Sequence, residues 1–424
     1  MRRYFPLFPG CMVLTVCLLA VPAGTVRAQA APCGKDREVG AKALDEVTWK
    51  QLNGIYEEVT RENYDDAYNE LQNMLGRAGR DEYLRAIINQ ALAQLEWTRE
   101  NFDASLAYFE KAVELDALPD EAHFALMYQI AQLYFMQERY RDALDRLELW
   151  FCTAPGEKIT AAAYVLKASI FVHMKDYRQT LQAIDQAISM EPAPVEAWYQ
   201  LKLASHYELK QYPQAAATLE LMIARWPEKK LYWTQLAQTY SSLQQHDKAL
   251  AVAALAWRKK LMTTQADITY LTSLYANANV PYKAAAILQN AIEDKVVQSA
   301  GKFWTLVADL WYRSEELEKA LTAYEKAAAD SSSGEIDLHR GYILIDLERW
   351  APAREALDAA LARGGMDERK MGEAYLLRGM AEFNLENYDQ ASADWGRASK
   401  YPAARNAAQQ WMNHLQEQRK LHAL

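Results

Sequence analysis

The stretch NFDASLAYF, residues 101–109, decides the fold, because altered copies of it recur along most of the chain. RYRDALDRL begins at Arg139, QYPQAAATL at Gln211 and NYDQASADW at Asn387. Each copy has an aromatic residue, His or Leu, then two mostly polar residues, then a small residue. The small residue falls at Ala67, Ser105, Ala143, Thr180, Ala215, Ala249, Ala284, Ala320, Ala353 and Ala391. The nearly constant interval between these positions indicates an internal repeat.

Other positions around the small residue repeat as well, as expected for two helices that pack together. A large side chain such as Phe109 or Trp395 stands four residues later, and a small residue such as Ala93, Gly341 or Gly379 stands twelve residues earlier. Only 16 Gly and 13 Pro occur in 424 residues, which favours helix throughout. Each helix pair has an apolar stripe that only the next pair can bury. We therefore predict an all-α fold in which helix-turn-helix units add into a solenoid.

This period and this pattern resemble the tetratricopeptide repeat, a helix-turn-helix unit of about 34 residues. The resemblance runs from about residue 45 to residue 400, and it implies a right-handed α-α superhelical solenoid of about ten repeats. Residues 29–44 match no repeat, and we interpret them as a lead-in segment. Residues 401–424 carry Ala407, Trp411 and Leu415 at helical spacing, so we expect a C-terminal capping helix there.

Residues 1–28 have the layout of a secretory signal peptide. Arg2 and Arg3 precede an apolar run, CMVLTVCLLA at 11–20, and small residues follow the run. The run is too short for a transmembrane helix, which needs about 20 apolar residues. We predict cleavage after Ala28 or Ala30, localisation in the periplasm and no stable membrane insertion after cleavage. An uncleaved membrane anchor is the alternative.

Cleavage would leave two cysteines, Cys33 and Cys152, in an oxidising compartment. We predict that they form a disulfide bond. The closed loop would exceed 100 residues, and the chain-entropy model gives such a loop a stabilisation of roughly 4–5 kcal/mol. Two free thiols are the alternative.

Charge and motif content argue against several classes of function. The chain has 47 basic and 56 acidic residues, and an acidic surface without a basic stripe argues against nucleic acid as a partner. The sequence has no glycine-rich phosphate loop and no Gly-x-Ser-x-Gly motif, and none of its seven His stands at metal-ligand spacing with another His or a Cys. We therefore expect no enzyme activity, no cofactor and no metal site, and we expect proteins as partners.

The resemblance also implies a binding groove, because first-helix residues at the second, fifth, ninth and twelfth repeat positions face the concave side of such a superhelix. The groove residues that we expect are Gln90, Gln94, Trp97, Tyr128, Gln132, Phe135, Gln200, Tyr207, Thr234, Gln238, Thr269 and Ser273. Amides can hydrogen-bond an extended peptide, and aromatic side chains add contact area. Toward the C-terminal end the expected groove residues include Asp309, Glu335 and Glu373, which should make this part mildly acidic and would suit a basic segment. A merely soluble inner face is the alternative.

A narrower resemblance concerns the N-terminal part of the chain. A signal peptide, a Cys-Gly lead-in ending in Arg-Glu-Val-Gly, loose repeats and a Cys in the third repeat are similar to the tetratricopeptide proteins encoded beside TonB, ExbB and ExbD. The residues that carry this resemblance are Cys33, Gly34, Arg37, Glu38, Val39, Gly40 and Cys152. It implies a periplasmic accessory of TonB-dependent transport of iron complexes, with the periplasmic domains of TonB or ExbD as partners. The alternatives are a scaffold for envelope assembly, such as polysaccharide or pilus export, and a peptide- or glycan-binding module.

Overall fold

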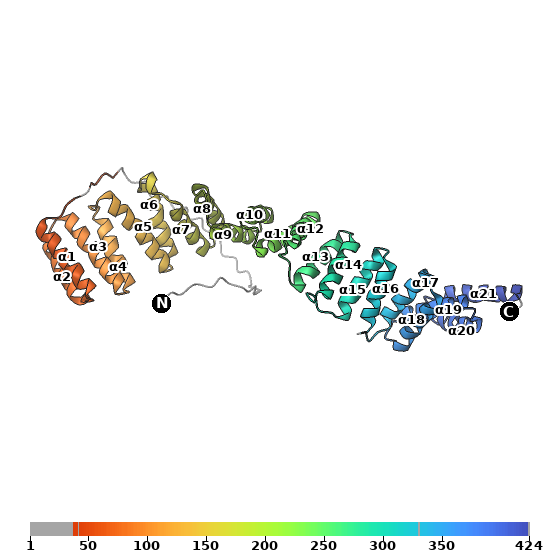
Figure 1. Cartoon of the computed structure of the whole chain (residues 1–424). Helices are drawn as coiled ribbons and strands as arrows, with labels where there is room; N and C mark the ends of the chain where they lie inside the picture. Colours follow the sequence, from red (N-terminus) through yellow and green to blue (C-terminus); the bar gives the residue numbers. More distant parts are fainter. Residues whose placement is uncertain (1–36, 41, 330, 423–424) are drawn as a thin grey trace, which may run out of the picture. The chain divides into compact units, whose positions relative to one another are not determined.

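The computed structural model describes residues 37–40, 42–329 and 331–422. All regular structure in this part of the chain is helical, and helices pack mainly against their neighbours in chain order (Figure 1). The described residues fall into two compact units, an N-terminal unit that ends at Lys175 and a C-terminal unit that begins at Asp176. The predicted fold class, an all-helical α-α solenoid, is confirmed. The predicted signal peptide lies outside the described residues.

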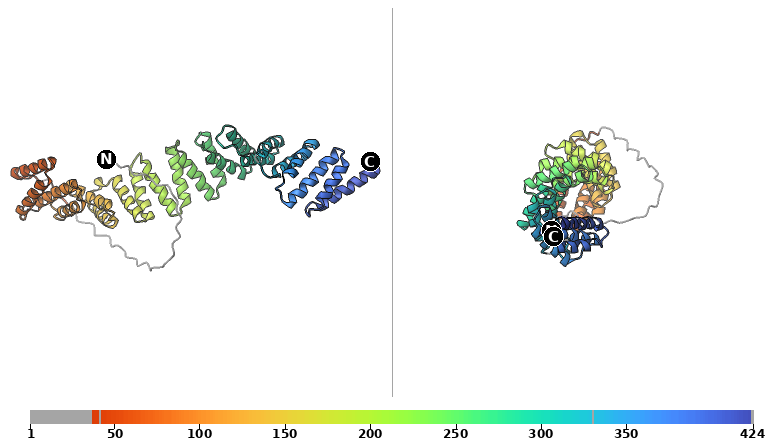
Figure 2. Two further views of the ribbon diagram at one scale, coloured as in Figure 1. Left: turned by 90° about the horizontal axis from the view of Figure 1, so that it is seen from below. Right: turned by 90° about the vertical axis from the view of Figure 1, so that its right-hand side faces the viewer.

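Helices alternate as first and second members of successive repeats, and Figure 2 shows the helices of each unit lying side by side. The N-terminal unit contains α1 (Glu46–Thr60), α2 (Tyr64–Arg77), α3 (Glu82–Thr98), α4 (Phe102–Glu114), α5 (Asp120–Met136), α6 (Tyr140–Thr153), η1 (Gly156–Lys158) and α7 (Ala161–His173). The C-terminal unit contains α8 (Tyr177–Met190), α9 (Glu196–Glu208), α10 (Tyr212–Arg225), α11 (Lys230–Ser242), α12 (His246–Arg258), α13 (Gln265–Asn277), α14 (Pro281–Glu293), α15 (Gly301–Arg313), α16 (Leu317–Ala328), α17 (Glu335–Asp346), α18 (Trp350–Arg363), α19 (Glu368–Asn384), α20 (Tyr388–Ala398) and α21 (Arg405–His422).

The ten small residues of the repeat occupy one structural position. Each is the fourth residue of an even-numbered helix, and each is fully buried, with 0 % exposure. Ser105 and Thr180 are tolerated there because their hydroxyls donate to the carbonyl oxygens of Ala93 (2.8 Å) and Asp176 (3.0 Å). A buried hydroxyl bonded in this way keeps its hydrogen bond and loses little on burial.

Where a first helix carries glycine twelve residues before the small residue, the large side chain of the second helix fills the place of the missing Cβ. A Cβ on Gly379 of α19 would lie 2.5 Å from Nε1 of Trp395, and one on Gly341 of α17 would lie 2.6 Å from Cδ2 of Leu357. Both distances are far below the ordinary contact distance of about 3.5–4.0 Å. The small residue twelve places before the anchor and the large one four places after it therefore face each other, as the repeat pattern predicts.

One tight turn joins the two helices of each repeat, and its middle residue has a positive φ without being glycine. Glu100 (φ 61°), Lys210 (56°) and Glu315 (61°) are examples. In most of these turns the next residue donates its N–H to a carbonyl five positions back, as Asn101 does to Glu96 (2.9 Å), which is the Schellman pattern of helix ends. An L-residue in this left-handed conformation costs roughly 1–2 kcal/mol. Rules that look for glycine at helix ends therefore miss these turns.

The last helix, α21, covers the C-terminal end of the described chain. Ala408 and Leu415 of α21 are buried in a cluster with Trp395, and Trp411 stacks on Trp395 with ring centroids 5.5 Å apart. Within the described residues, no helix combines the length and the apolar character needed to span a bilayer.

Candidate functional site

Two adjoining clefts run along α5 in the N-terminal unit. The larger, which we name the Trp97 cleft, has a volume of about 610 Å³. Its lining comes from α3, α5 and α7 and consists of Trp97, Ala125, Gln129, Gln132, Leu133, Phe135, Met136 and Leu166. The smaller, which we name the Trp150 cleft, has a volume of about 280 Å³. Its lining consists of Glu121, Phe124, Ala125, Tyr128, Trp150, Lys158 and Thr160. Because both clefts include Ala125, we treat them together as the α5 groove.

The helical period of α5 explains why these side chains share a face. Ala125, Gln129, Gln132 and Met136 follow one another at steps of four, three and four residues, which places them on one stripe of the helix. Ala125 is exposed although it is small and apolar, and Met136 keeps 62 % of its surface exposed. Most of the remaining surface of α5 is buried by its neighbours. The stripe is thus an open surface on a helix that is otherwise largely core.

Several polar groups of the α5 groove have no partner among the described residues. The side-chain amides of Gln129 and Gln132 and the indole N–H of Trp97 make no hydrogen bond there. The Tyr128 hydroxyl is also unbonded within the described chain, and burial raises its pKa above the ordinary tyrosine value. The groove therefore offers several donors and acceptors that an extended main chain can use.

Charge is confined to one end of the α5 groove. The Trp97 cleft has no ionisable side chain in its lining. At the far end of the Trp150 cleft Lys158 is paired with Glu121 at 2.5 Å, so these two charges offset each other. Trp150 is buried and donates its indole N–H to the carbonyl of Phe124 (2.9 Å), which fixes the aromatic wall of this cleft. The arrangement suits an uncharged occupant.

The structure brings together some of the groove residues expected from the sequence. Trp97, Gln132 and Phe135 line the Trp97 cleft, and Tyr128 lines the Trp150 cleft. Gln90 and Gln94 lie on α3 but line neither cleft; Gln94 is exposed and Gln90 is half-buried. Sequence reasoning missed Ala125, Gln129 and Met136, although their spacing on α5 could have indicated them. The lining also includes Leu166 from the next first helix.

In the C-terminal unit the polar groups of most expected groove residues form hydrogen bonds within the protein. Gln200 donates to the hydroxyl of Tyr232 (2.9 Å), and Tyr207 shares a hydrogen bond with Thr239 (2.7 Å). The hydroxyls of Thr234, Thr269 and Ser273 donate to backbone carbonyls of their own helices, and Gln238 is exposed without a partner in the described chain. These residues therefore offer a partner fewer free groups than those along α5.

Of the three carboxylates that suggested a mildly acidic C-terminal end, Glu335 and Glu373 are paired with basic residues. Glu335 pairs with Lys370 at 2.7 Å, and Glu373 pairs with Arg369 at 3.1 Å. Glu373 also accepts a hydrogen bond from the Tyr342 hydroxyl (2.7 Å). Basic residues outside the concave positions therefore offset the charge of Glu335 and Glu373, whereas Asp309 accepts a hydrogen bond from the neutral Tyr324 hydroxyl (2.5 Å). An acidic C-terminal end of the groove stays a prediction.

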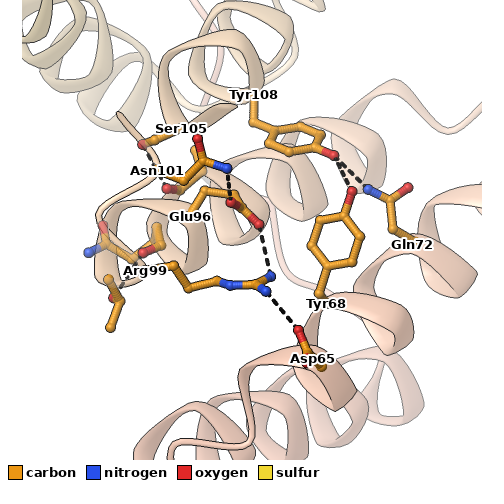
Figure 3. A network of polar contacts seen from close by, with 11 residues as sticks. Asp65, Tyr68, Gln72, Glu96, Arg99, Asn101, Ser105 and Tyr108 are labelled. Carbon is orange, nitrogen blue, oxygen red and sulfur yellow. Dashed lines mark hydrogen bonds and ion pairs between the residues drawn. The ribbon is translucent and has the colours of Figure 1, made fainter. Parts of the chain in front are cut away.

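A partly buried polar network joins α2, α3 and α4 (Figure 3). Glu96 is buried, and it accepts hydrogen bonds from Asn101 (2.8 Å) and from Arg99 (3.2 Å), which also reaches Asp65 (2.7 Å). The same Glu-to-Asn contact across the turn recurs at other pairs, such as 58 with 63 and 382 with 387. This repeated Glu-x4-Asn spacing is a sequence signal that could have indicated the network.

A second part of the network links two tyrosines. The hydroxyls of Tyr68 and Tyr108 lie 2.9 Å apart, and Gln72 donates to Tyr108 at 2.7 Å (Figure 3). Burial and the neighbouring Tyr68 hydroxyl raise the pKa of Tyr108 to about 12. Tyr108 is thus neutral at ordinary pH and serves as a structural hydrogen-bond hub.

The lead-in segment is anchored on the turn between α4 and α5. Arg37 keeps only 11 % of its side chain exposed and donates from Nε to Oδ1 of Asp116 (2.6 Å). Its other nitrogens bond the carboxylate of Asp120 and the carbonyl of Leu118. Val39 then pairs with Asp120, donating its N–H to Oδ1 (3.1 Å) and accepting the Asp120 N–H at its carbonyl (3.0 Å). The lead-in segment therefore reaches the first turn of α5.

Cys152 lies in the last turn of α6. Its predicted partner, Cys33, lies outside the described residues, so the pairing of these two cysteines stays a prediction. Among the described residues, no group of three or more His, Cys, Asp or Glu side chains is arranged to hold a metal ion.

Comparison with protein families gives matches over much of the chain. One model described as tetratricopeptide repeat matches residues 90–149, 273–335 and 338–410, and a second model with the same description matches residues 161–194. Together they cover more than half of the chain. No curated protein matches its sequence.

Similar solved structures include other repeat proteins. One is a tetratricopeptide repeat protein from Parabacteroides merdae, with 14 % identity and a TM-score of 0.30, covering 60 % of this chain and 98 % of that one. Another is YrrB, described as a TPR protein with an unusual peptide-binding site, with 16 % identity and a TM-score of 0.36, covering 47 % of this chain and all of that one. A third is Cut9–Hcn1 of the APC/C, with 12 % identity and a TM-score of 0.29, covering 87 % and 84 %. These likenesses are too distant to carry an argument about function.

Proposed function

Because this chain belongs to the tetratricopeptide-repeat family, we propose that it is a non-catalytic scaffold that binds an extended segment of a partner protein in the α5 groove. The observation that carries this proposal is the combination of open aromatic surface and unpaired amides along α5, at Trp97, Gln129, Gln132 and Phe135. Aromatic side chains supply most of the binding energy in many interfaces, and free amides pair with main-chain groups.

The length and charge of the groove limit what the segment can be. α5 has 17 residues, and at 1.5 Å per residue it is about 25 Å long. An extended chain rises about 3.3 Å per residue, so about seven residues fit along it. A charged side chain in the Trp97 cleft would lose its water without gaining a counter-ion, which is costly. The segment that fits is therefore uncharged, with apolar side chains for the two clefts.

At the finer level we propose a periplasmic accessory of a TonB-dependent transport system. Support comes from the signal-like N-terminus and from the resemblance carried by Cys33, Gly34, Arg37 and the residues after them. A Cys33–Cys152 disulfide belongs to this proposal. Cys33 stands four residues before Arg37 in the sequence.

Mild crosslinking of the chain that lacks residues 1–28 to the periplasmic domains of TonB and ExbD tests both levels. We expect recovery of at least one domain, and Trp97→Ala should weaken it by tenfold or more, as loss of a hot-spot residue does. Trp257→Ala is the matched control, because Trp257 is also partly exposed (39 %) but lies on α12.

The outcomes separate the two levels of the proposal. Recovery that Trp97→Ala leaves unchanged would remove the α5 groove as the binding site. If neither domain is recovered, the TonB assignment fails, and the general scaffold is then tested with envelope-assembly proteins as bait. Binding of uncharged glycans but not of peptides by the same groove would instead favour a glycan-binding module.

A further inference from the structure

His123 is a buried titratable residue without a hydrogen-bond partner in the described chain, and it lies beside the contacts that anchor the lead-in segment. We call these contacts the clasp: Arg37 with Asp116, Leu118 and Asp120, and the main chain of Val39 with the Oδ1 and N–H of Asp120. His123 stands in the first turn of α5, and its Nδ1 has no hydrogen bond. The nearest carboxylate oxygen of the clasp is Oδ1 of Asp116, 3.7 Å away, which already accepts from Arg37 Nε at 2.6 Å.

We propose that His123 and the clasp form an acid-sensitive latch on the α5 groove, closed while the imidazole is neutral and weakened when it is protonated. Protonation puts a second cation next to the buried Arg37 guanidinium. The imidazolium also competes with Arg37 for the Asp116 carboxylate. Both effects loosen the hold of Arg37, and with it the lead-in segment, on the turn between α4 and α5.

Burial and the charged groups around His123 together set the direction of its pKa shift. Burial lowers the pKa of His123 most, and Arg37 of the lead-in segment lowers it further. Asp116 in the turn and Asp120 on α5 act in the opposite direction, while Arg146 on α6 adds to the lowering. The net direction is a pKa below the ordinary value of about 6.5. The neutral imidazole is therefore the form that fits the closed clasp.

The pH window follows from this direction. A group whose pKa is lower in the closed state binds more protons in the open state, so closure is favoured as pH rises. The closed clasp is fully stable above about pH 6.5. It loses stability as pH falls below that value, by at most about tenfold per pH unit for one proton.

The clasp is connected to the groove through the first turns of α5. Asp120 binds the lead-in segment, and the next residue, Glu121, and then Phe124 line the Trp150 cleft. His123 packs edge-on against Phe124, with ring centroids 5.5 Å apart. Opening of the clasp therefore frees the turn that shapes one end of the groove. This regulatory role rests on the proposed function of the groove, whereas the latch itself does not.

Native-state hydrogen exchange of the chain that lacks residues 1–28, without any partner, tests the latch between pH 7.5 and 5.5. After correction for intrinsic exchange rates, we expect the protection of the Val39 and Asp120 amides to fall about threefold to tenfold toward pH 5.5. In His123→Phe the protection should stay constant, and in the control His173→Gln, at an exposed histidine of α7, it should fall as in the native chain.

A second variant keeps the test decisive if His123→Phe disturbs packing. Arg37→Gln opens the clasp at every pH, so its protection should be low at pH 7.5 and independent of pH. Constant protection in the native chain would overturn the proposal, and so would an equal fall in His123→Phe or native-like protection in Arg37→Gln. Because no partner is present, these failures are distinct from a failure of groove binding.

Discussion

The close contact between α19 and α20 makes Gly379→Ala a sharp test of how the repeats pack. The new Cβ would lie 2.5 Å from Nε1 and 2.6 Å from Cδ1 of Trp395. To restore an ordinary contact the indole would have to retreat by about 1 Å. Trp395 is fully buried, donates to the carbonyl of Leu376 (3.2 Å) and stacks on Trp411, so it has no free direction in which to move.

The expected free-energy change is the difference of two effects. Replacing glycine by alanine inside a helix stabilises by about 0.5–1 kcal/mol, whereas overpacking a well-filled core costs about 1–3 kcal/mol. We expect a net loss of about 1–2 kcal/mol. Gly396→Ala is the matched control: Gly396 lies in α20, and a Cβ there meets nothing within 4 Å. It should gain about 0.5–1 kcal/mol.

Native-state hydrogen exchange of the α19–α21 amides is the suitable assay, because repeat proteins do not unfold in a single two-state step. Gly379→Ala should speed exchange in these helices, and Gly396→Ala should slow it. If both variants stabilise by the same amount, the indole has room to move, and the argument that Trp395 requires glycine in α19 is refuted.

Three further substitutions test other parts of the structure. Glu315→Gly should stabilise the α15–α16 repeat by about 1 kcal/mol, because it relieves the positive φ of 61°. Slower hydrogen exchange in α15 and α16 measures this gain, and no gain would contradict a strained turn. Asn101→Ala should cost about 1–3 kcal/mol, because it leaves the buried Glu96 carboxylate without its amide partner. Faster hydrogen exchange in α3 and α4 reports the loss, and unchanged exchange would show that Glu96 gains nothing from the amide. Asp394→Ala should cost about 3 kcal/mol or more, because the largely buried Arg378 loses both of its bonds to that carboxylate. Hydrogen exchange in α19 and α20 that stays at the native rate would show that Asp358 alone suffices for Arg378.

The sequence alone determined the type of fold. The reason is geometric: a helix pair can pack closely only where one helix has a small residue facing a large one, and this requirement returns once per repeat. The ten small residues therefore have the same burial, and the repeat pattern alone assigns Gly379 and Gly341 to close contacts. Such constraints are local in sequence, because both partners stand within about one repeat of each other.

The turns between helices lie at the limit of what sequence rules detect. Glu100, Lys210 and Glu315 adopt the left-handed conformation that glycine normally supplies. The packing of the two flanking helices holds each residue in this left-handed conformation. Because the cause is tertiary packing, the residue type at the turn does not reveal the conformation. The recurring Glu-x4-Asn spacing is a sequence pattern that marks some of these turns.

Which groove residues are free to bind was decided by tertiary structure. A concave position such as Gln200 or Glu373 is defined by the repeat, but whether its polar group is available depends on a neighbour one repeat away, Tyr232 or Tyr342. Likewise, nothing in the order of residues showed that Arg37 would be held by the turn before α5. Because the repeat is periodic, its sequence is enough to specify the scaffold. Hydrogen bonds and ion pairs between side chains of adjacent repeats are not periodic. The α5 groove and the clasp beside it can therefore be identified only from the tertiary structure.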